Sequence, residues 1–445
     1  MRERFRAAIA ILLALPIAAG FTALGASCQD VSFHLASRPL EDDAGASARA
    51  GAAGSGGGGG GATGGTAGSG GSADAAIGGT AGSGQPVQPA CSDPLTFADP
   101  DLESLLGPIH PADVAGITEL DLLEEYVAPE NAFTPDYYSA PPVADGLITS
   151  LVGIECLTNL EKLEMDPIYV DLEPLAQLPH LTELDFGPMQ ETNIPRLPQI
   201  TTLAGPVSGD FVNTGADNTA TLLRAFPSLE WLDIRGNFGA PDAGPALAAL
   251  TNLTHLSVSQ GLSAPSGTDL EPLTKLTDLS LSDCGYTDAS FVSYLTDLTS
   301  LDLSFNIIQD ISPISDLVQL TTLDLSRNFI RDISNIWRNS QLTSLNLDGD
   351  VVSDISPLSG LTNLSTLDLS GNVIQDISPL SGLIGLTDLD LSNNLVVDLS
   401  PLVANPGIGA GDLVDVSGNQ LDCTKQKQNI ATLRQRGVTL SVDCP

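Results

Sequence analysis

The chain has 445 residues and a formal net charge of −38, with only 17 lysines and arginines. This balance excludes a nucleic-acid-binding surface, because phosphate contacts need clustered basic residues, and it argues against electrostatic docking on anionic lipid. The length allows two or three domains, and the charge favours basic partners.

The first thirty residues have the pattern of an export signal. The basic segment MRERFR precedes the apolar run AAIAILLALPIAAGFTAL, and small residues then lead to Cys28. This order resembles a bacterial lipoprotein signal, which implies removal of residues 1–27 and lipidation of Cys28. Gly25 stands where such signals usually have leucine, so an ordinary secretory signal is the alternative.

Either kind of signal predicts export into an oxidising compartment. With the lipid anchor, we expect the outer membrane or cell surface of a Gram-negative bacterium. Gln29 favours the outer membrane, because an aspartate there would suggest retention at the inner membrane. Without the anchor, the expected location is the periplasm.

Residues 28–90 are rich in glycine, alanine and serine and contain almost no bulky apolar side chains. Such a composition cannot bury a core, so the segment is expected to be disordered. About 45 residues of random coil span on the order of 35–40 Å. The segment is therefore predicted to be a tether that holds a folded domain away from a membrane.

Residues 91–156 are predicted to form an N-terminal cap. The stretch FADPDLESLLG places Asp99, Pro100 and Asp101 before an apolar-periodic run, which is typical of a helix start. Residues 127–146 are rich in proline, tyrosine and alanine and predict an irregular loop.

A leucine-rich phrase repeats through residues 157–422, with the pattern L-x-x-L-x-L-x-x-N. The alternation in LDL predicts a short strand with leucine inward and aspartate outward. The asparagine amide is expected to bind the backbone of the turn that follows. The asparagine position recurs at a 22-residue spacing and is occupied by Cys284, Asn306, Asn328, Asp350, Asn372 and Asn394.

The segment DISPL follows most strands of the array. Its serine is expected to cap, and its proline to begin, a tight helical or 3₁₀ turn. These serines are Ser312, Ser356, Ser378 and Ser400. One repeat cannot bury its leucine face alone, so the repeats must stack. Residues 181–262 depart from the pattern, which we interpret as repeat decay with a short helix near 218–226.

This 22-residue phrase, with DISPLSGLTNL between strands, resembles the leucine-rich repeats of bacterial internalins and of eukaryotic phosphatase-regulatory subunits. The resemblance covers roughly the last two-thirds of the chain. It implies an α/β repeat solenoid: a right-handed superhelix with a parallel sheet on the concave face, 3₁₀ or short helical turns on the convex face, and a cap at each end. The export signal contradicts a cytoplasmic phosphatase regulator.

Residues 423–445 are predicted to cap the far end with an amphipathic helix, ended by Gly437, and a last strand. Cys423 and Cys444 flank this cap and are expected to form a disulfide. Cys91 and Cys156 bracket the N-terminal cap and are expected to pair likewise. Cys284 is then a core thiol outside the disulfides.

The sequence offers no catalytic or metal-binding constellation. The histidines are scattered, and there is neither a C-x-x-C nor an H-E-x-x-H segment. We therefore expect no enzyme activity, no metal and no cofactor.

Polar residues beside the strand leucines are expected to share one face. The aspartates of adjacent strands would lie about 4.8 Å apart in a ladder that is interrupted at Asn346. Carboxylates this close are expected to raise one another's pKa or to recruit cations. Calcium near Asp368 is disfavoured because strands do not wrap an ion. The predicted ligand face comprises Asp302, Ser304, Asp324, Ser326, Asn346, Asp348, Asp368, Ser370, Asp388, Asp390 and Ser392.

Three functions are compatible with these features. The first is an exported, lipid-anchored, monomeric protein that binds a basic protein partner through its concave face. The second is a structural envelope or adhesion protein without one specific ligand, and the third is an enzyme with an unrecognised carboxylate site. A binder should expose aromatic residues on the concave face, where Phe305 and Phe329 are the nearest candidates.

Overall fold

The computed structural model describes residues 91, 93–110, 112, 114–122, 148, 150–165, 170–186, 194–204, 219–234, 242–258 and 264–444. These residues lie in one compact unit, and a second unit, Ser32–Gln88, lies outside them. The signal, Cys28, the tether and the loop at 127–146 also fall outside the described residues.

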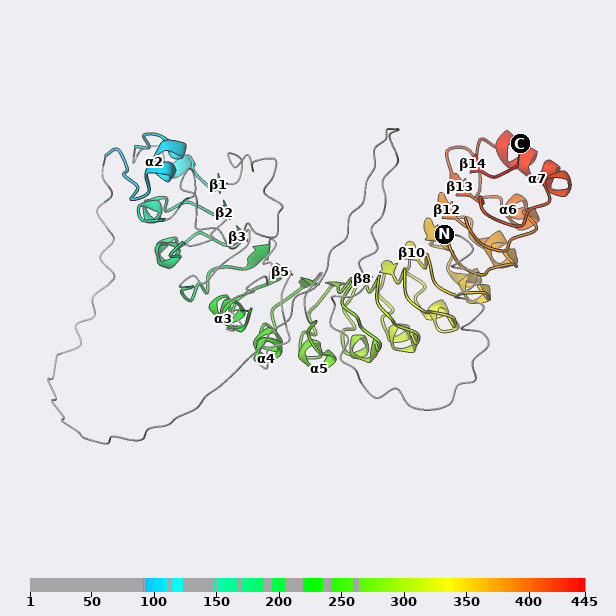
Figure 1. Cartoon of the computed structure of the whole chain (residues 1–445), viewed down its shortest axis with the longest axis horizontal. Helices are drawn as coiled ribbons and strands as arrows, with labels where there is room; N and C mark the ends of the chain where they lie inside the picture. The colour runs from blue at the N-terminus through cyan, green and yellow to red at the C-terminus, as the bar shows by residue number, and fades with distance from the viewer. Residues whose placement is uncertain are drawn as a thin grey trace, which may run out of the picture. The chain divides into compact units, whose positions relative to one another are not determined.

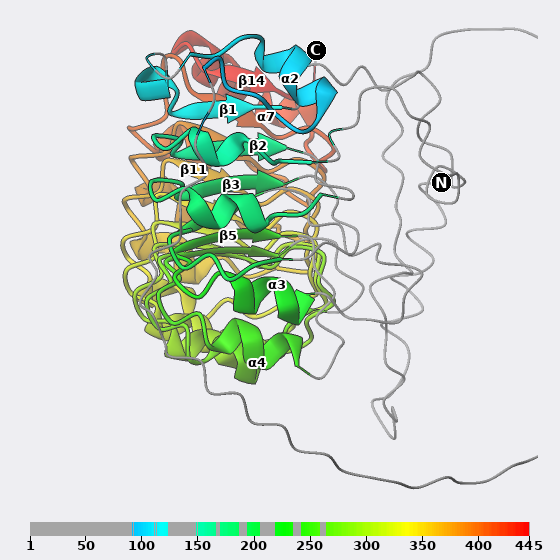
Figure 2. The ribbon, with the colours of Figure 1, turned by 90° about the vertical axis from the view of Figure 1, so that its left-hand side faces the viewer.

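The described residues form one 14-stranded sheet whose strands are all parallel and follow chain order (Figure 2). The strands are β1 (Glu119–Asp121), β2 (Lys162–Met165), β3 (Glu183–Phe186), β4 (Thr202–Ala204), β5 (Trp231–Ile234), β6 (His255–Val258), β7 (Asp278–Ser280), β8 (Ser300–Asp302), β9 (Thr322–Asp324), β10 (Ser344–Asn346), β11 (Thr366–Asp368), β12 (Asp388–Asp390), β13 (Leu413–Asp415) and β14 (Thr439–Ser441).

Short helices and 3₁₀ turns lie on the side opposite the sheet, and the unit curves with the sheet on its inner side (Figure 1). The α-helices are α2 (Pro100–Leu106), α3 (Thr219–Ala225), α4 (Ala243–Ala248), α5 (Gly267–Leu270), α6 (Ser400–Ala404) and α7 (Cys423–Gln435). The 3₁₀ turns are η1 (Val114–Gly116), η3 (Ile154–Cys156), η4 (Glu173–Gln177), η5 (Ser290–Tyr294), η6 (Ser312–Asp316), η7 (Ile336–Arg338), η8 (Ser356–Gly360) and η9 (Ser378–Gly382).

The predicted solenoid class is confirmed. Leu301, Leu323 and Leu345 stand opposite one another at the centres of adjacent strands and are almost fully buried. Each strand is one residue out of step with the LDL phrase, because it begins before the first leucine and ends at the aspartate. The second leucine lies in the turn and is still buried, as at Leu303. The predicted helix near 218–226 is α3.

An aspartate just before the helical turn, not the predicted serine, accepts a backbone N–H at the start of that turn. The backbone N–H of Ser312 donates to Oδ1 of Asp310 at 2.8 Å. Ser312 is already the first residue of η6, so its side chain stands too late to cap the turn. The same pair recurs as Asp332–Ser334, Asp354–Ser356, Asp376–Ser378 and Asp398–Ser400.

The asparagine ladder joins successive repeats. Asn306 is buried, and its Nδ2 donates to the carbonyl of Leu303 in its own turn and to that of Leu281 one repeat earlier, both at 2.9 Å. Its Oδ1 accepts from the N–H of Tyr286, also in the preceding repeat. The sequence predicted only the bond within the turn. The amide therefore satisfies polar backbone groups on both sides of each repeat boundary.

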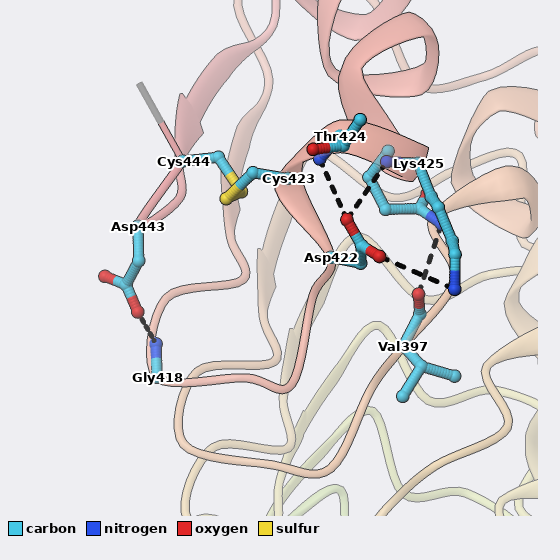
Figure 3. Close-up of a disulfide and its surroundings, with 9 residues drawn as sticks. Val397, Gly418, Asp422, Cys423, Thr424, Lys425, Asp443 and Cys444 are labelled. Carbon is cyan, nitrogen blue, oxygen red and sulfur yellow. Dashed lines mark hydrogen bonds and ion pairs between the residues drawn. A yellow bond between two sulfur atoms is a disulfide. The ribbon is translucent and has the colours of Figure 1, made fainter.

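Both ends of the stack are closed by disulfide-linked caps. Cys91 is bonded to Cys156, and Cys423 to Cys444, which are the two pairs that the sequence suggested. In the C-terminal cap, Asp422 accepts hydrogen bonds from the N–H groups of Thr424 and Lys425 at the start of α7 (Figure 3). Ile430 and Leu433 of α7 cover the last leucine layer.

Candidate functional site: the inner face of the sheet

Two rows of side chains project from the inner face, which we define as the side of the sheet away from the helical turns. One row comes from the first residue of each strand and the other from the third, because the central leucine points into the core. In the row formed by the third residues, strand register aligns Asp302 with Asp324, and Asp368 with Asp390. The ladder expected from the sequence is therefore present in the sheet.

Each ladder carboxylate also ends its own strand. Oδ1 of Asp302 accepts the N–H of Ser304 at 2.9 Å, and Asn346 accepts the N–H of Asp348 at 3.0 Å in the same way. The arrangement recurs at Asp324, Asp368, Asp390 and Asp415. These hydrogen bonds show that the row contributes to the turn at the end of each strand.

Neighbouring polar groups relieve part of the repulsion along the ladder. Nδ2 of Asn346 donates to Oδ2 of Asp324 at 3.0 Å, and the hydroxyl of Ser280 donates to Oδ2 of Asp302 at the same distance. Burial raises the pKa of Asp368, and the charges of Asp390 and Asp348 raise it further. At Asp368, burial outweighs the like-charge repulsion considered in the sequence analysis.

Four serines of the predicted ligand face are buried at the end of the strand, with exposed fractions between 5% and 8%. One example is Ser370, whose hydroxyl donates to Oδ1 of Asp348 at 2.8 Å. They line the turn rather than the inner face because each strand ends two residues before its serine. The four are Ser304, Ser326, Ser370 and Ser392.

The charged positions of the predicted face differ in exposure. Asp388 is exposed in the first row of β12. Asp348 lies in the turn after β10, where its Oδ2 pairs with Nε of Arg327 at 2.7 Å. Asp348 is thus already neutralised by a residue of the preceding repeat.

An aromatic pair that the sequence analysis missed lies on the inner face. Trp231 on β5 and His255 on β6 occupy the first row, and their rings stack with centroids 3.4 Å apart and planes 5° apart. Trp231 is 43% exposed. Burial lowers the pKa of His255, whose Nδ1 is buried without a hydrogen-bond partner in the described part of the chain. The sequence feature that could have located this pair was the tryptophan in EWLDI, which lies within the segment interpreted as decayed repeats.

Phe305 and Phe329, the sequence candidates, are exposed but lie in turns beyond the strands. Phe305 also has a φ of 55°, in the left-handed region. They therefore stand beside the inner face rather than on it.

The N-terminal part of the inner face carries a charged cluster on β2 and β3. Nζ of Lys162 lies 2.7 Å from Glu164 and 3.0 Å from Glu183, and these bonds raise the pKa of Lys162 above its usual range. Asp185 is half-buried, and its pKa is raised by burial first and by the charge of Glu164 next. Carboxylates outnumber the single cation here.

No group of three or more His, Cys, Asp or Glu side chains is arranged to hold a metal within the described ranges. Cys284 is a buried thiol whose Sγ lies 3.4 Å from the carbonyl of Val258. Among the helices that the structure describes, none combines the length and apolarity needed to cross a membrane.

Comparison with known proteins agrees with this architecture. A family model for leucine-rich repeats matches residues 296–337, 340–382 and 362–404. A sequence comparison with curated proteins found no significant match. The structure of an internalin, InlF from Listeria monocytogenes, is similar over 78% of this chain and 91% of its own, with 24% identity and a TM-score of 0.51.

Two further structures share less of the geometry. A leucine-rich-repeat protein of Leptospira interrogans has 18% identity over 75% of this chain and 97% of its own, with a TM-score of 0.43. The functional domain of InlJ from Listeria monocytogenes has 17% identity over 69% and 74%, with a TM-score of 0.41. We base the fold assignment on the first structure. At 24% identity, this likeness supports the fold and not a shared function.

Proposed function

We propose that this chain, a leucine-rich-repeat solenoid with the fold of an internalin, is a non-enzymatic scaffold that binds a basic protein segment on its inner face. The observation that carries the proposal is the inner face itself, where carboxylates stand in register on β8 and β9 and again on β11 and β12, and an exposed tryptophan stands on β5. Aromatic anchors within a polar surface are typical of protein interfaces. The net charge of −38 favours a basic partner.

Photo-crosslinking from defined positions tests the binding face. A photoreactive residue at position 322 or 366, both in the first row, should capture a partner in the producing cells. The same residue at position 337, on η7 at the opposite side, should not. The proposal fails if position 337 captures the same partner equally well.

Neutral variants of the ladder give a matched test of charge. Asp302, Asp324, Asp368 and Asp390 are changed together to Asn, because Asn346 shows that an amide accepts the same backbone N–H. We expect capture to fall by about tenfold, which equals roughly 1.4 kcal/mol, and to depend less on salt concentration than capture by the wild type. Unchanged capture would exclude the ladder as the binding surface.

We further propose that the chain is exported and anchored by a lipid on Cys28, with residues 28–90 as the tether. The two disulfides support an oxidising compartment. Protease treatment of intact cells should remove the repeats of the native protein, and Cys28→Ala should release a soluble form. A native protein that is soluble and protected would overturn the anchor.

A structural role without a specific ligand is the second candidate. It is favoured by the hydrogen bonds that the ladder carboxylates already accept from their own backbone. That role predicts no capture from either first-row position.

A further inference from the structure

On the inner face, the small side chains of β4 lie between the larger side chains of β3 and β5, an arrangement that we call the notch. β4 contributes only the small side chains Thr202 and Ala204, which are partly exposed. Register places Glu183 and Asp185 of β3 on one side of them and Trp231 on β5 on the other. Since adjacent strands lie about 4.8 Å apart, β3 and β5 are roughly 10 Å apart, a separation that one flat group above β4 could bridge.

One wall of the notch is an aromatic surface. His255 covers the face of the indole of Trp231 that is turned toward β6. β5 lies between β4 and β6, so the opposite face of the indole is turned toward the notch. Trp231 is 43% exposed although it is stacked. The stacking fixes the orientation of the ring before any ligand arrives.

The other contribution is an excess of negative charge. Asp185 experiences the charges of Glu164, Glu183 and Asp233, which all act on it in the same direction. Lys162 opposes them, but its ammonium group is bound to Glu164 and Glu183 on the side of the notch away from Trp231. A cation that enters over β4 would therefore meet carboxylates from both β3 and β5.

We propose that this notch receives the guanidinium group of an arginine in the protein partner, stacked on Trp231 and paired with Asp185 and Asp233. A guanidinium is planar, stacks on aromatic rings and forms paired hydrogen bonds with carboxylates. An ammonium ion offers the charge without the flat shape. The inference rests on the proposed function, because it names the group of the partner that the inner face selects.

The chain contains two tryptophans, which makes the site directly observable. In a Trp337→Phe background, Trp231 is the only tryptophan left, and Trp337 is exposed enough to be replaced. The probes are acetyl-arginine amide and the peptide acetyl-Gly-Arg-Gly amide, with citrulline as the uncharged analogue and lysine as the ammonium analogue. The indole N–H resonance and the fluorescence of Trp231 are followed during titration.

Both arginine probes should shift the Trp231 resonance saturably, with a dissociation constant on the order of 1 mM. Lysine should bind more weakly, and citrulline should cause no saturable shift. Asp185→Asn with Asp233→Asn should weaken binding at least about tenfold. Asp316→Asn, on η6 at the side opposite the inner face, should leave it unchanged. An equal response to citrulline, or unaltered binding by the double variant, would overturn the site.

Two further arms separate this site from its alternatives. Binding of free acetyl-arginine amide without binding of the peptide would indicate a small-molecule site and overturn the assignment to a protein partner. Trp231→Phe retains a stacking ring and controls for folding. The notch is excluded, while the scaffold function stands, if two results are found together. Trp231→Ala leaves crosslinking from positions 322 and 366 intact, and the arginine probes cause no shift in the protein that retains Trp231. An arginine shift without any crosslinking would exclude the scaffold function instead.

Discussion

The backbone N–H of Ile330 donates to Oδ1 of Asp350 at 2.9 Å, at a position where most neighbouring repeats hold asparagine. Oδ2 of Asp350 is buried without a hydrogen-bond partner among the described residues. In the next repeat, the corresponding Nδ2 of Asn372 donates to the carbonyl of Leu347 at 2.7 Å. Burial raises the pKa of Asp350 to about 8. The protonated carboxyl is the form that can donate as asparagine does.

Asp350 should make stability fall as pH rises. Its pKa is raised from 3.8 to about 8 on folding, so its contribution is complete below the unfolded value and is lost as pH rises toward the folded value. One pKa unit corresponds to about 1.4 kcal/mol, which implies a loss of a few kcal/mol by about pH 8. Urea unfolding of wild type and Asp350→Asn across this window measures the slope. The variant should be more stable at pH 8, and an unchanged slope would assign the effect to another group.

Removal of the aspartate that precedes α6 should destabilise the start of this helix. Asp398 accepts the N–H of Ser400 at 3.0 Å, and its hydrogen bonds to Ser400 lower its pKa. Asp398→Ala should cost about 1 kcal/mol, whereas Asp398→Asn should retain most of the bond. Because the folded pKa is lowered, the native contribution is present above the unfolded pKa and is lost as pH falls through the folded one. Equal unfolding midpoints for Asn and Ala variants would contradict the cap.

Loss of the Cys423–Cys444 disulfide should loosen the C-terminal cap. The bond closes a sequence separation of 21 residues, for which chain entropy gives roughly 3 kcal/mol. A Cys423→Ser, Cys444→Ser double variant should exchange amide hydrogens faster in β13 and β14 than wild type. Strands β8 and β9 should change much less, since a repeat contacts only its neighbours. Uniform acceleration through the array would show that the cap is not a separate unit.

Cys284 should react with thiol reagents only after unfolding. Its side chain is buried, and its Sγ approaches the carbonyl of Val258. In a Cys28→Ala background, Cys284 is the one thiol that the two disulfides leave. We expect slow labelling of the native protein and rapid labelling of one thiol in denaturant. Fast labelling under native conditions would show that this repeat opens locally.

Much of the fold could be predicted because the residues within each repeat are sufficient to identify its strand and turns. The phrase around Leu367 and Asn372 identifies strand, turn and helical return, and equal spacing transfers that identification to its neighbours. Features set by contact between repeats were harder to predict. Asn306 bonds to Leu281, and Ser370 to Asp348, through a stacking register that one repeat alone does not reveal.

The candidate site was predicted least well in the irregular repeats. Trp231 and His255 stack because β5 and β6 are adjacent and in register. Their separation along the chain differs from 22 residues, so the regular spacing that located Asp302 and Asp324 did not locate them. Ser304 was misplaced for a related reason, since alternation was extended two residues beyond the end of β8.

The equal register of β8 to β12 also means that the array can change in length by whole repeats. Residues 22 apart make equivalent hydrogen bonds, as Ser365 with Thr343 and Thr343 with Thr321 do. Deletion of residues 361–382 would join Gly360 to Leu383, which reproduces the LSGL junction already present at 382–383. Removal or insertion of one 22-residue unit can therefore shorten or lengthen the inner face by one strand, about 4.8 Å, while every remaining strand keeps a neighbour of the same kind.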